Sequence, residues 1–161
     1  MSREQKFARI LAIADVLSKH TYEEQRPSIE QRYRTALTKN PAKVLKLIHK
    51  DLMDYSHKWN EKEWLLFEVL GEEIAKLDLE ELTNEELSEL FYPHLGSAKV
   101  EMWNVVGVEE AAKILGLSPG TVKNKCAKGE IPAKKIGMSW VIDKTKLAHK
   151  GDDRDQKNNT R

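Results

Sequence analysis

Helix-start patterns recur through the first hundred residues, and they constrain the fold more than any other feature. Three of them pair a Ser, Thr or Asn with a Glu or Gln three residues later, which is the capping box that opens an α-helix. These pairs are Ser28 with Gln31, Asn60 with Glu63, and Thr83 with Glu86. The fourth is Asn40-Pro41, an N-cap residue before the proline favoured at the first helical position. Because apolar residues almost never alternate here, the sequence predicts an α-helical bundle over residues 1–102.

Apolar residues recur at helical spacing along these segments. A first helix over about residues 2–20 has one apolar face, made of Phe7, Ile10, Leu11, Ala14 and Leu17. The helix after Asn60 has a face made of Trp64, Leu66, Phe67, Leu70, Ile74 and Leu77. We expect the helix after Thr83 to end or kink at Pro93, because proline removes a backbone donor and clashes with the preceding turn.

Charge divides the chain into three blocks, although the net charge is only +1. Residues 1–60 hold 12 Lys or Arg against 7 Asp or Glu, residues 61–100 hold 3 against 11, and residues 101–161 hold 12 against 8. The two basic blocks favour separate surfaces with nucleic acid as the anionic partner, and the acidic block suits a protein contact or plain solubility. Solvated helix faces give the same charge pattern, so this alternative stays open.

Four lysines in the second and third helices fall at i, i+4, i+7 and i+11. They are Lys39, Lys43, Lys46 and Lys50. Such a stripe can follow a phosphate backbone without reading its sequence. The alternative is again a solvated face.

The last fifty residues change in character after Trp103. Residues 108–115 form a short amphipathic segment ended by Gly116, and Ser118-Pro119 then opens a second helix, which is the sequence form of a helix-turn-helix. Val122 and Cys126 would face the core. Residues 131–136 and 139–142 are expected to form a hairpin, and a last short helix follows to about residue 147.

This stretch resembles the excisionase-type (MerR-like) winged helix-turn-helix over residues 103–149. The resemblance rests on Trp103, residues 108–112, 115–118, 121–122 and 129–137, and residues 140–142. It implies a mainly α chain in which a small winged helix-turn-helix with a two-stranded hairpin follows the bundle. It also implies double-stranded DNA as a partner, with a recognition helix in the major groove and a basic wing on the backbone. The implied DNA-binding residues are Ser118, Thr121, Lys123, Asn124, Lys128, Lys134 and Lys135.

One departure from that family lies at the start of the recognition helix. Pro119 and Gly120 stand where arginines are frequent, and neither can make a bidentate base contact. Base reading would then fall on Thr121, Lys123 and Asn124, with Asn124 suited to adenine. We expect modest sequence specificity, or a module that serves protein contacts instead.

A second resemblance covers about residues 5–100. Residues 28–36, 40–42 and 44–47 are similar to the C-terminal helical region of the type I-C CRISPR large subunit, which also exists as a separate small subunit. The resemblance implies a contact with complex subunits and with nucleic acid. The positions that carry over are Arg32, Tyr33, Arg34 and Pro41, with a core aromatic as the alternative for Tyr33. The Gly-Tyr-Tyr of that family is replaced by Phe91-Tyr92-Pro93.

Together these features favour a non-enzymatic nucleic-acid-binding protein. The leading hypothesis is an anti-CRISPR that mimics a subunit of the type I-C complex. The alternatives are a transcriptional or excision regulator whose bundle forms a homodimer, and a working accessory subunit of the complex.

No catalytic group, cofactor motif or metal-ligand spacing is found in the sequence. No apolar run is long enough to span a membrane, the N-terminus lacks a signal-peptide pattern, and Cys126 stands alone, so we expect a cytoplasmic protein. Residues 150–161 are charged and are expected to be a disordered tail.

Overall fold

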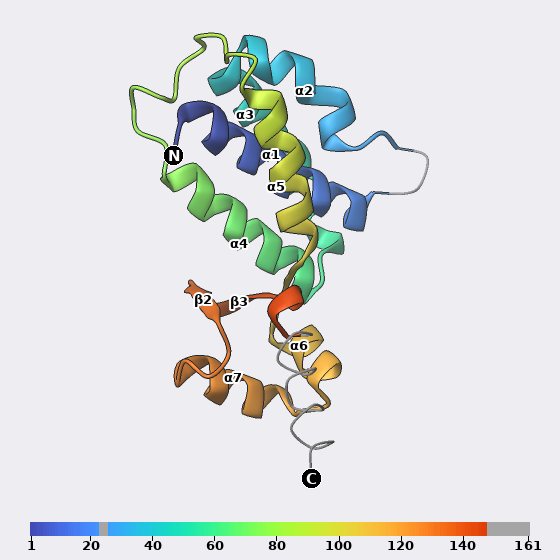
Figure 1. Ribbon diagram of the computed structural model, residues 1–161. Helices are drawn as coiled ribbons and strands as arrows, with labels where there is room; N and C mark the ends of the chain where they lie inside the picture. Colours follow the sequence, from blue (N-terminus) through green and yellow to red (C-terminus); the bar gives the residue numbers. More distant parts are fainter. Residues whose placement is uncertain (23–25, 148–161) are drawn as a thin grey trace. The chain divides into compact units, whose positions relative to one another are not determined.

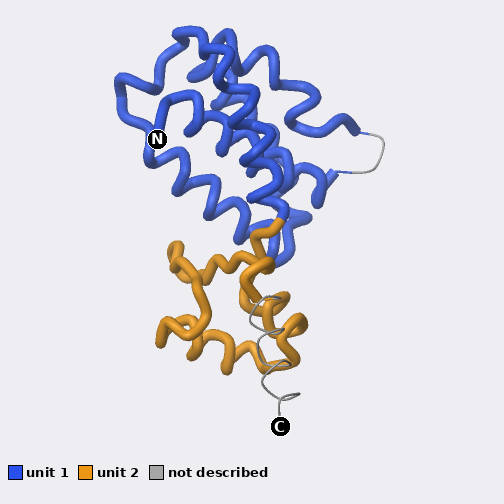
Figure 2. The backbone as a smooth tube through the Cα atoms, in the orientation of Figure 1, with its two compact units in different colours: residues 1–103 blue, residues 104–161 orange. Residues whose placement is uncertain are grey.

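The computed structural model describes residues 1–22 and 26–147, which fall into two compact units. The first unit is Met1–Trp103, and the second begins at Asn104 (Figure 2). The expected tail over residues 150–161 lies outside the described residues.

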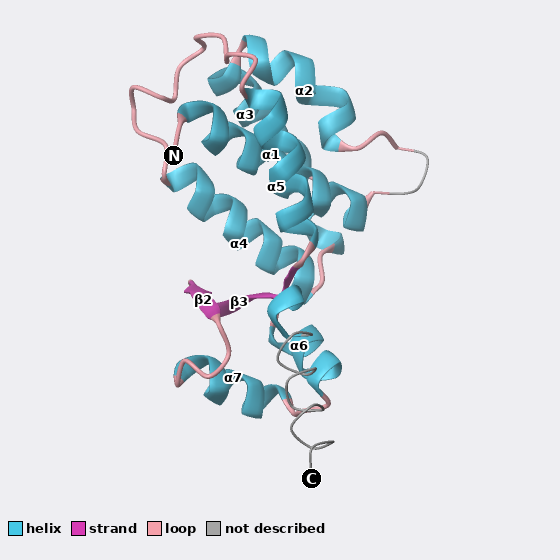
Figure 3. Ribbon diagram, in the orientation of Figure 1, coloured by secondary structure: helices cyan, strands magenta, loops and turns pink. Residues whose placement is uncertain are grey.

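All the regular elements that the structure describes in the first unit are helices, as the start patterns predict (Figure 3). Its elements are α1 (Arg3–Thr21), α2 (Ile29–Lys39), α3 (Pro41–Met53), a 3-10 turn (Ser56–Lys58), α4 (Glu61–Ala75) and α5 (Phe91–Trp103). Ser28 and Gln31 form the predicted capping box of α2, and Pro41 is the first residue of α3. The prediction of a mainly α chain with a small C-terminal helix-turn-helix is confirmed.

Helix α1 is the centre of this unit and contacts α2, α3, α4 and α5 (Figure 1). Every residue from Phe7 to Ser18 except Arg9 is buried. The predicted face is therefore correct but incomplete, because Ala8, Ala12 and Ile13 on the other sides are fully buried too. A helix that is apolar all round is a core helix, and the neighbours that surround it are set by the tertiary structure.

The expected helix at Thr83 does not form, so this prediction is wrong. Residues 83–88 are non-helical, and the backbone N–H groups of Ala42 and Leu87 bond the Thr83 and Thr38 carbonyls at 3.2 and 2.8 Å. Pro93 does not end a helix either but lies in the first turn of α5. The first-turn N–H groups have no acceptor within a helix, so proline costs nothing there.

The apolar face of α4 also differs from the prediction. The buried residues are Leu65, Leu66, Val69, Leu70 and Glu73. Trp64 is 45% exposed, and its ring meets the rings of Trp59 and Phe67 with centroids 4.8 and 6.1 Å apart. The buried face of α4, which packs against α1, is therefore rotated toward Leu65 and Val69.

The second unit has a three-stranded antiparallel sheet in the order β1-β3-β2. Its elements are β1 (Val105–Val106), α6 (Val108–Leu115), α7 (Pro119–Ala127), β2 (Ala133–Ile136) and β3 (Ser139–Asp143). The predicted hairpin is present, but β1 corrects the two-stranded expectation, since Val106 pairs with Ile142. Two residues are too few to show an alternating pattern, so this strand could not be predicted from periodicity.

The core of the second unit lies between α6, α7 and the sheet. It includes the predicted pair Val122 and Cys126, together with Val106, Val108, Ala111, Ala112, Ile131, Ile142 and Leu147. Gly116 and Gly129 end α6 and α7 in the left-handed conformation, with φ of 68° and 78°. In each case the next residue's N–H bonds a carbonyl five residues back, the pattern of a Schellman cap.

Candidate nucleic-acid interface

Helix α7 presents one polar face to solvent. Val122 and Cys126 are buried, which turns Lys123, Asn124 and Lys128 outward, where all three are exposed. Among the residues that the structure describes, no side chain forms a hydrogen bond or ion pair with these three. Because no internal partner holds them, the two ammonium groups and the amide are available to a ligand.

Ser118 and Thr121 form hydrogen bonds with each other at the N-terminus of α7. The Ser118 hydroxyl accepts a hydrogen bond from the Thr121 N–H at 3.2 Å, and the two hydroxyls lie 2.7 Å apart. Pro119 and Gly120 fill the exposed first turn between them. The geometry assigns Ser118 an N-cap role, and Thr121 would need to break its side-chain contact to reach a base.

The wing is the β2–β3 hairpin, turned by Gly137 and Met138. Gly137 has φ of 58°, which fits the first central position of a two-residue hairpin turn. Lys134 and Lys135 are both exposed on β2. Lys135 lies 5.6 Å over the ring of its cross-strand partner Trp140, so that its aliphatic stem is supported and its ammonium group is held near the hairpin tip.

Comparison with known proteins identifies the module. A family model described as Helix-turn-helix domain matches residues 105–149. The match begins at β1 and includes both helices and the wing, so the second unit has the elements of a helix-turn-helix domain. No curated protein and no solved structure matches the chain.

The predicted lysine stripe lies beside acidic residues at one end. Lys39, Lys43, Lys46 and Lys50 are all exposed, and none forms an ion pair within the described ranges. The Lys43 N–H bonds the Asn84 side chain at 2.9 Å, which brings the acidic connection between α4 and α5 against the start of α3. The start of α3 at Lys43 therefore lies beside the acidic block, whereas Lys46 and Lys50 lie further along the helix.

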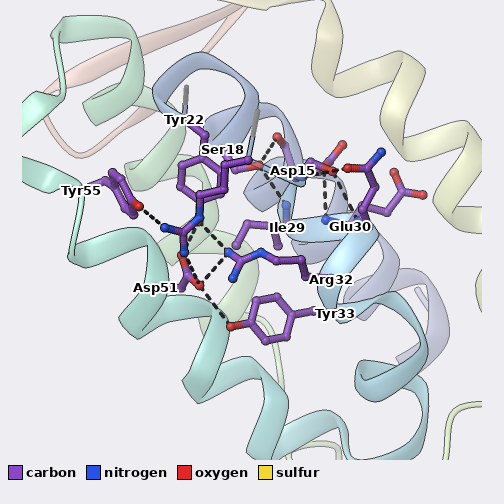
Figure 4. A network of polar contacts seen from close by, with 12 residues as sticks. Asp15, Ser18, Tyr22, Ile29, Glu30, Arg32, Tyr33, Asp51 and Tyr55 are labelled. Atoms are coloured by element: carbon purple, nitrogen blue, oxygen red, sulfur yellow. Dashed lines mark hydrogen bonds and ion pairs between the residues drawn. The ribbon is translucent and has the colours of Figure 1, made fainter. Parts of the chain in front are cut away.

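Arg32 and Tyr33 point toward Asp51 of α3 (Figure 4). The Arg32 guanidinium pairs with the Asp51 carboxylate at 2.7 Å, and the Tyr33 hydroxyl donates to it at 3.1 Å. The Tyr22 hydroxyl also donates to Asp51, and Arg26 pairs with it at 3.4 Å. Asp51, which sequence reasoning missed because it follows a run of lysines, is the centre of a network that joins α1, α2 and α3.

Burial and hydrogen bonding shift the titration of this network. Burial opposes ionisation of Asp51, but hydrogen bonds from Tyr22 and Arg32 outweigh it and hold the pKa of the carboxyl below its ordinary 3.8. Burial, together with the bond to Asp51, raises the pKa of the Tyr22 hydroxyl well above 10.0. Asp51 is therefore a carboxylate and Tyr22 a neutral donor at neutral pH.

Arg34 does not join this network. Its guanidinium pairs loosely with Glu30, at 3.8 Å, and lies 6.0 Å from the centroid of the Tyr92 ring. The side chain is 53% exposed. Of the three carried-over residues on α2, Arg34 is thus the one that can readily reach a partner.

Within residues 1–22 and 26–147, no group of three or more His, Cys, Asp or Glu side chains could hold a metal ion. No helix there is both long and apolar enough to cross a membrane.

Proposed function

We propose that this protein is a non-enzymatic regulator or excision factor that binds double-stranded DNA through α7 and the wing. The observation that carries the proposal is the exposed face of α7, where the side chains of Lys123, Asn124 and Lys128 have no hydrogen bond or ion pair within the described residues. In a helix-turn-helix, the second helix lies in the major groove with its early residues toward base edges.

The residues on this face divide between base reading and backbone contact. Asn124 can donate and accept in the bidentate pattern that adenine presents, and Lys123 can donate to a base edge or to a phosphate. Lys128 supplies charge for phosphates. Lys134 and Lys135 on the wing would add phosphate contacts. Pro119 and Gly120 have no side-chain donor for a base, so the expected specificity is modest.

A gel shift with duplexes enriched from a random-core library tests this proposal. Lys123→Ala combined with Asn124→Ala should weaken binding by about tenfold or more, because it removes one phosphate contact and one base contact. Asn124→Ala alone should also relax the preference among the enriched sequences. Lys39→Ala removes a positive charge from the other unit and should leave affinity within about twofold.

Two results would count against the proposal. Binding that is unchanged in the double variant would remove α7 from the interface. An equal loss of DNA affinity in Lys39→Ala would show that the effect comes from removing any positive charge and not from α7. Circular dichroism of each variant controls for folding, which should be unaffected because all three side chains are exposed.

Association with a type I-C CRISPR complex, as a mimic or as an accessory subunit, stays a prediction that rests on the resemblance of residues 5–100. The exposed Arg34 and the lysines of α3 are the groups that such a contact would use. A pull-down of the tagged protein from cells that express the complex would recover its subunits. Recovery of the tagged protein alone would contradict the association and favour the DNA-binding regulator.

A further inference from the structure

The outer face of α3 carries three lysines and, within Pro41–Met53, no exposed carboxylate. Lys43, Lys46 and Lys50 fall at i, i+3 and i+7, and all three are exposed. The opposite side of the helix is buried and consists of Val44, Leu45, Ile48 and Leu52. The three ammonium groups therefore lie on the solvent side, along about 10 Å of helix.

Asp51 is the one carboxylate of α3, and its charge is used inside the unit (Figure 4). Its side chain is 10% exposed, the Arg32 guanidinium pairs with it at 2.7 Å, and the Tyr33 hydroxyl donates to it at 3.1 Å. Asp51 therefore does not offset the lysines, although it follows Lys50 directly in the chain. The exposed charges of α3 are all positive.

This arrangement is unfavourable for the free protein. Lys46 stands three residues after Lys43 and four before Lys50, so that neighbouring positive charges repel each other along the helix. Lys43 also lies in the first turn, which has no acidic residue, and the helix dipole disfavours a cation there. A bound polyanion would relieve both repulsions, whereas a face that is only solvated gains nothing from them.

Acidic residues border this face at both ends. The Lys43 N–H bonds the Asn84 side chain at 2.9 Å, where the acidic connection between α4 and α5 passes. At the other end, the exposed Asp54 lies one turn beyond Lys50. A polyanion that follows α3 would therefore contact mainly Lys46 and Lys50.

We propose that the outer face of α3 is a second contact with duplex DNA, made to the phosphate backbone and independent of base sequence. Over 10 Å of its axis a duplex carries about six phosphate charges, so that each ammonium group on this face can reach a phosphate. Such contacts add affinity and carry no direct information about the bases.

The choice of DNA over another polyanion rests on the proposed function. The first unit ends at Trp103 and the second begins at Asn104, with no linker between them. A duplex bound by the second unit is therefore present at a high effective concentration for the first. The added affinity would support a recognition helix whose first turn, at Pro119 and Gly120, has no side-chain donor for a base.

Fluorescence anisotropy of the full chain with a labelled duplex, measured at several salt concentrations, tests this contact. Each phosphate that a lysine neutralises adds about 0.9 to the slope of log Kd against log salt concentration. Lys46→Gln combined with Lys50→Gln should lower this slope by about 2 and weaken binding by about tenfold at about 0.1 M salt. The ratio of the affinities for enriched and scrambled duplexes should not change.

Two control variants separate a local contact from net charge. Lys46→Arg combined with Lys50→Arg keeps both charges and should keep the slope of the wild type. Leu79→Glu combined with Leu90→Glu makes the same change in net charge at leucines that are 89% and 63% exposed outside α3. This pair should change the slope by less than about 0.5, and a decrease equal to that of the glutamine variant would overturn the contact.

The outcomes separate this inference from the proposed function. A glutamine variant with the slope of the wild type, while Lys123→Ala combined with Asn124→Ala weakens binding, overturns the α3 contact alone. A lower slope in the glutamine variant, while the α7 variant binds like the wild type, overturns the proposed function and supports the α3 contact.

An anionic membrane is the other polyanionic surface that lysines on one helix face can bind. Co-sedimentation with vesicles of phosphatidylglycerol and phosphatidylcholine tests it. Vesicle binding that the glutamine variant loses, together with an unchanged salt slope for DNA, would assign the face to a membrane and overturn the proposal.

Discussion

Asp51 carries the one negative charge in a network with two arginines and two tyrosine hydroxyls. Its carboxylate accepts from Tyr33 at 3.1 Å and from Arg32 at 2.7 Å, and its side chain is only 10% exposed. Removing the charge leaves the partly buried Arg32 guanidinium without a counter-ion, which costs more than the pair itself contributes. The charge of Asp51 therefore stabilises the packing of α1, α2 and α3 against one another.

Asp51→Asn should destabilise the protein by about 2 kcal/mol, which lowers the melting temperature by roughly 5 to 10 °C. The amide keeps the size of the side chain but cannot balance the arginines. Thermal unfolding followed by circular dichroism measures the change. Asp54→Asn is the matched control, since Asp54 is exposed at the end of the same helix, and an equal loss in both variants would contradict the role of the network.

The same network predicts how stability depends on pH. The folded pKa of Asp51 lies below its ordinary 3.8, so its contribution is present above that value and is lost as the pH falls through the folded pKa. Wild type should lose stability between about pH 5 and pH 2, and Asp51→Asn should lose less. Some acid dependence should remain in the variant, because Arg9 and Lys76 also lower the pKa of the buried Glu73, against the effect of burial. Urea titrations at several pH values would measure both slopes, and identical slopes would contradict the assignment.

Among the helices, the N-terminus of α2 is capped by two side chains of α1. The Ile29 N–H donates to the Ser18 hydroxyl at 3.2 Å, and the Glu30 N–H donates to the Asp15 carboxylate at 3.0 Å (Figure 4). The third N–H, of Gln31, is bonded by Ser28 of the capping box. The Ser28 N–H donates to the Gln31 side chain at 3.0 Å, so all four amides that a helix leaves open are satisfied, and a carboxylate lies at the positive end of the helix dipole.

Ser18→Ala should destabilise the protein by about 1 to 2 kcal/mol, because it leaves a buried N–H of Ile29 without an acceptor. Ser97→Ala, at an exposed serine of α5, should change stability by less than about 0.5 kcal/mol. Chemical unfolding of the two variants gives both values. A loss no greater than that of the control would show that solvent replaces the bond.

For the molecule as a whole, the position of the boundary between the two units predicts which fragments should fold. The sequence places it after residue 102, and the described contacts place it after Trp103. Independent folding of each part stays a prediction. Strand β1 adds a constraint, because Val106 is fully buried against the core of the second unit and pairs with Ile142.

A fragment that starts at Asn104 should fold and retain the DNA affinity of the second unit, whereas one that starts at Val108 should not. The shorter fragment lacks β1 and exposes the core that Val106 covers. Dispersed amide resonances in NMR spectra would report the folded state. Equal spectra from the two fragments would show that β1 is dispensable.

Local patterns predicted most of the elements, because caps and periodicity act within a few residues. The starts of α2, α3 and α4, the hairpin turn at Gly137 and the core positions Val122 and Cys126 follow from such patterns. Thr83 is a position where such a local pattern gave a wrong prediction. Its capping pattern is present, but its carbonyl and the adjoining segment bond α2 and α3 instead.

By itself, the sequence determined that the chain is mainly helical and that a winged helix-turn-helix lies at its C-terminal end, since propensity, capping and turn chemistry are local. Only the tertiary structure decided that α1 is surrounded on all sides, that Arg32 and Tyr33 bond Asp51, and that Tyr92, Val100 and Trp103 of α5 are exposed. Each of these depends on which distant segments meet, and burial and charge pairing over such distances leave no fixed spacing in the chain.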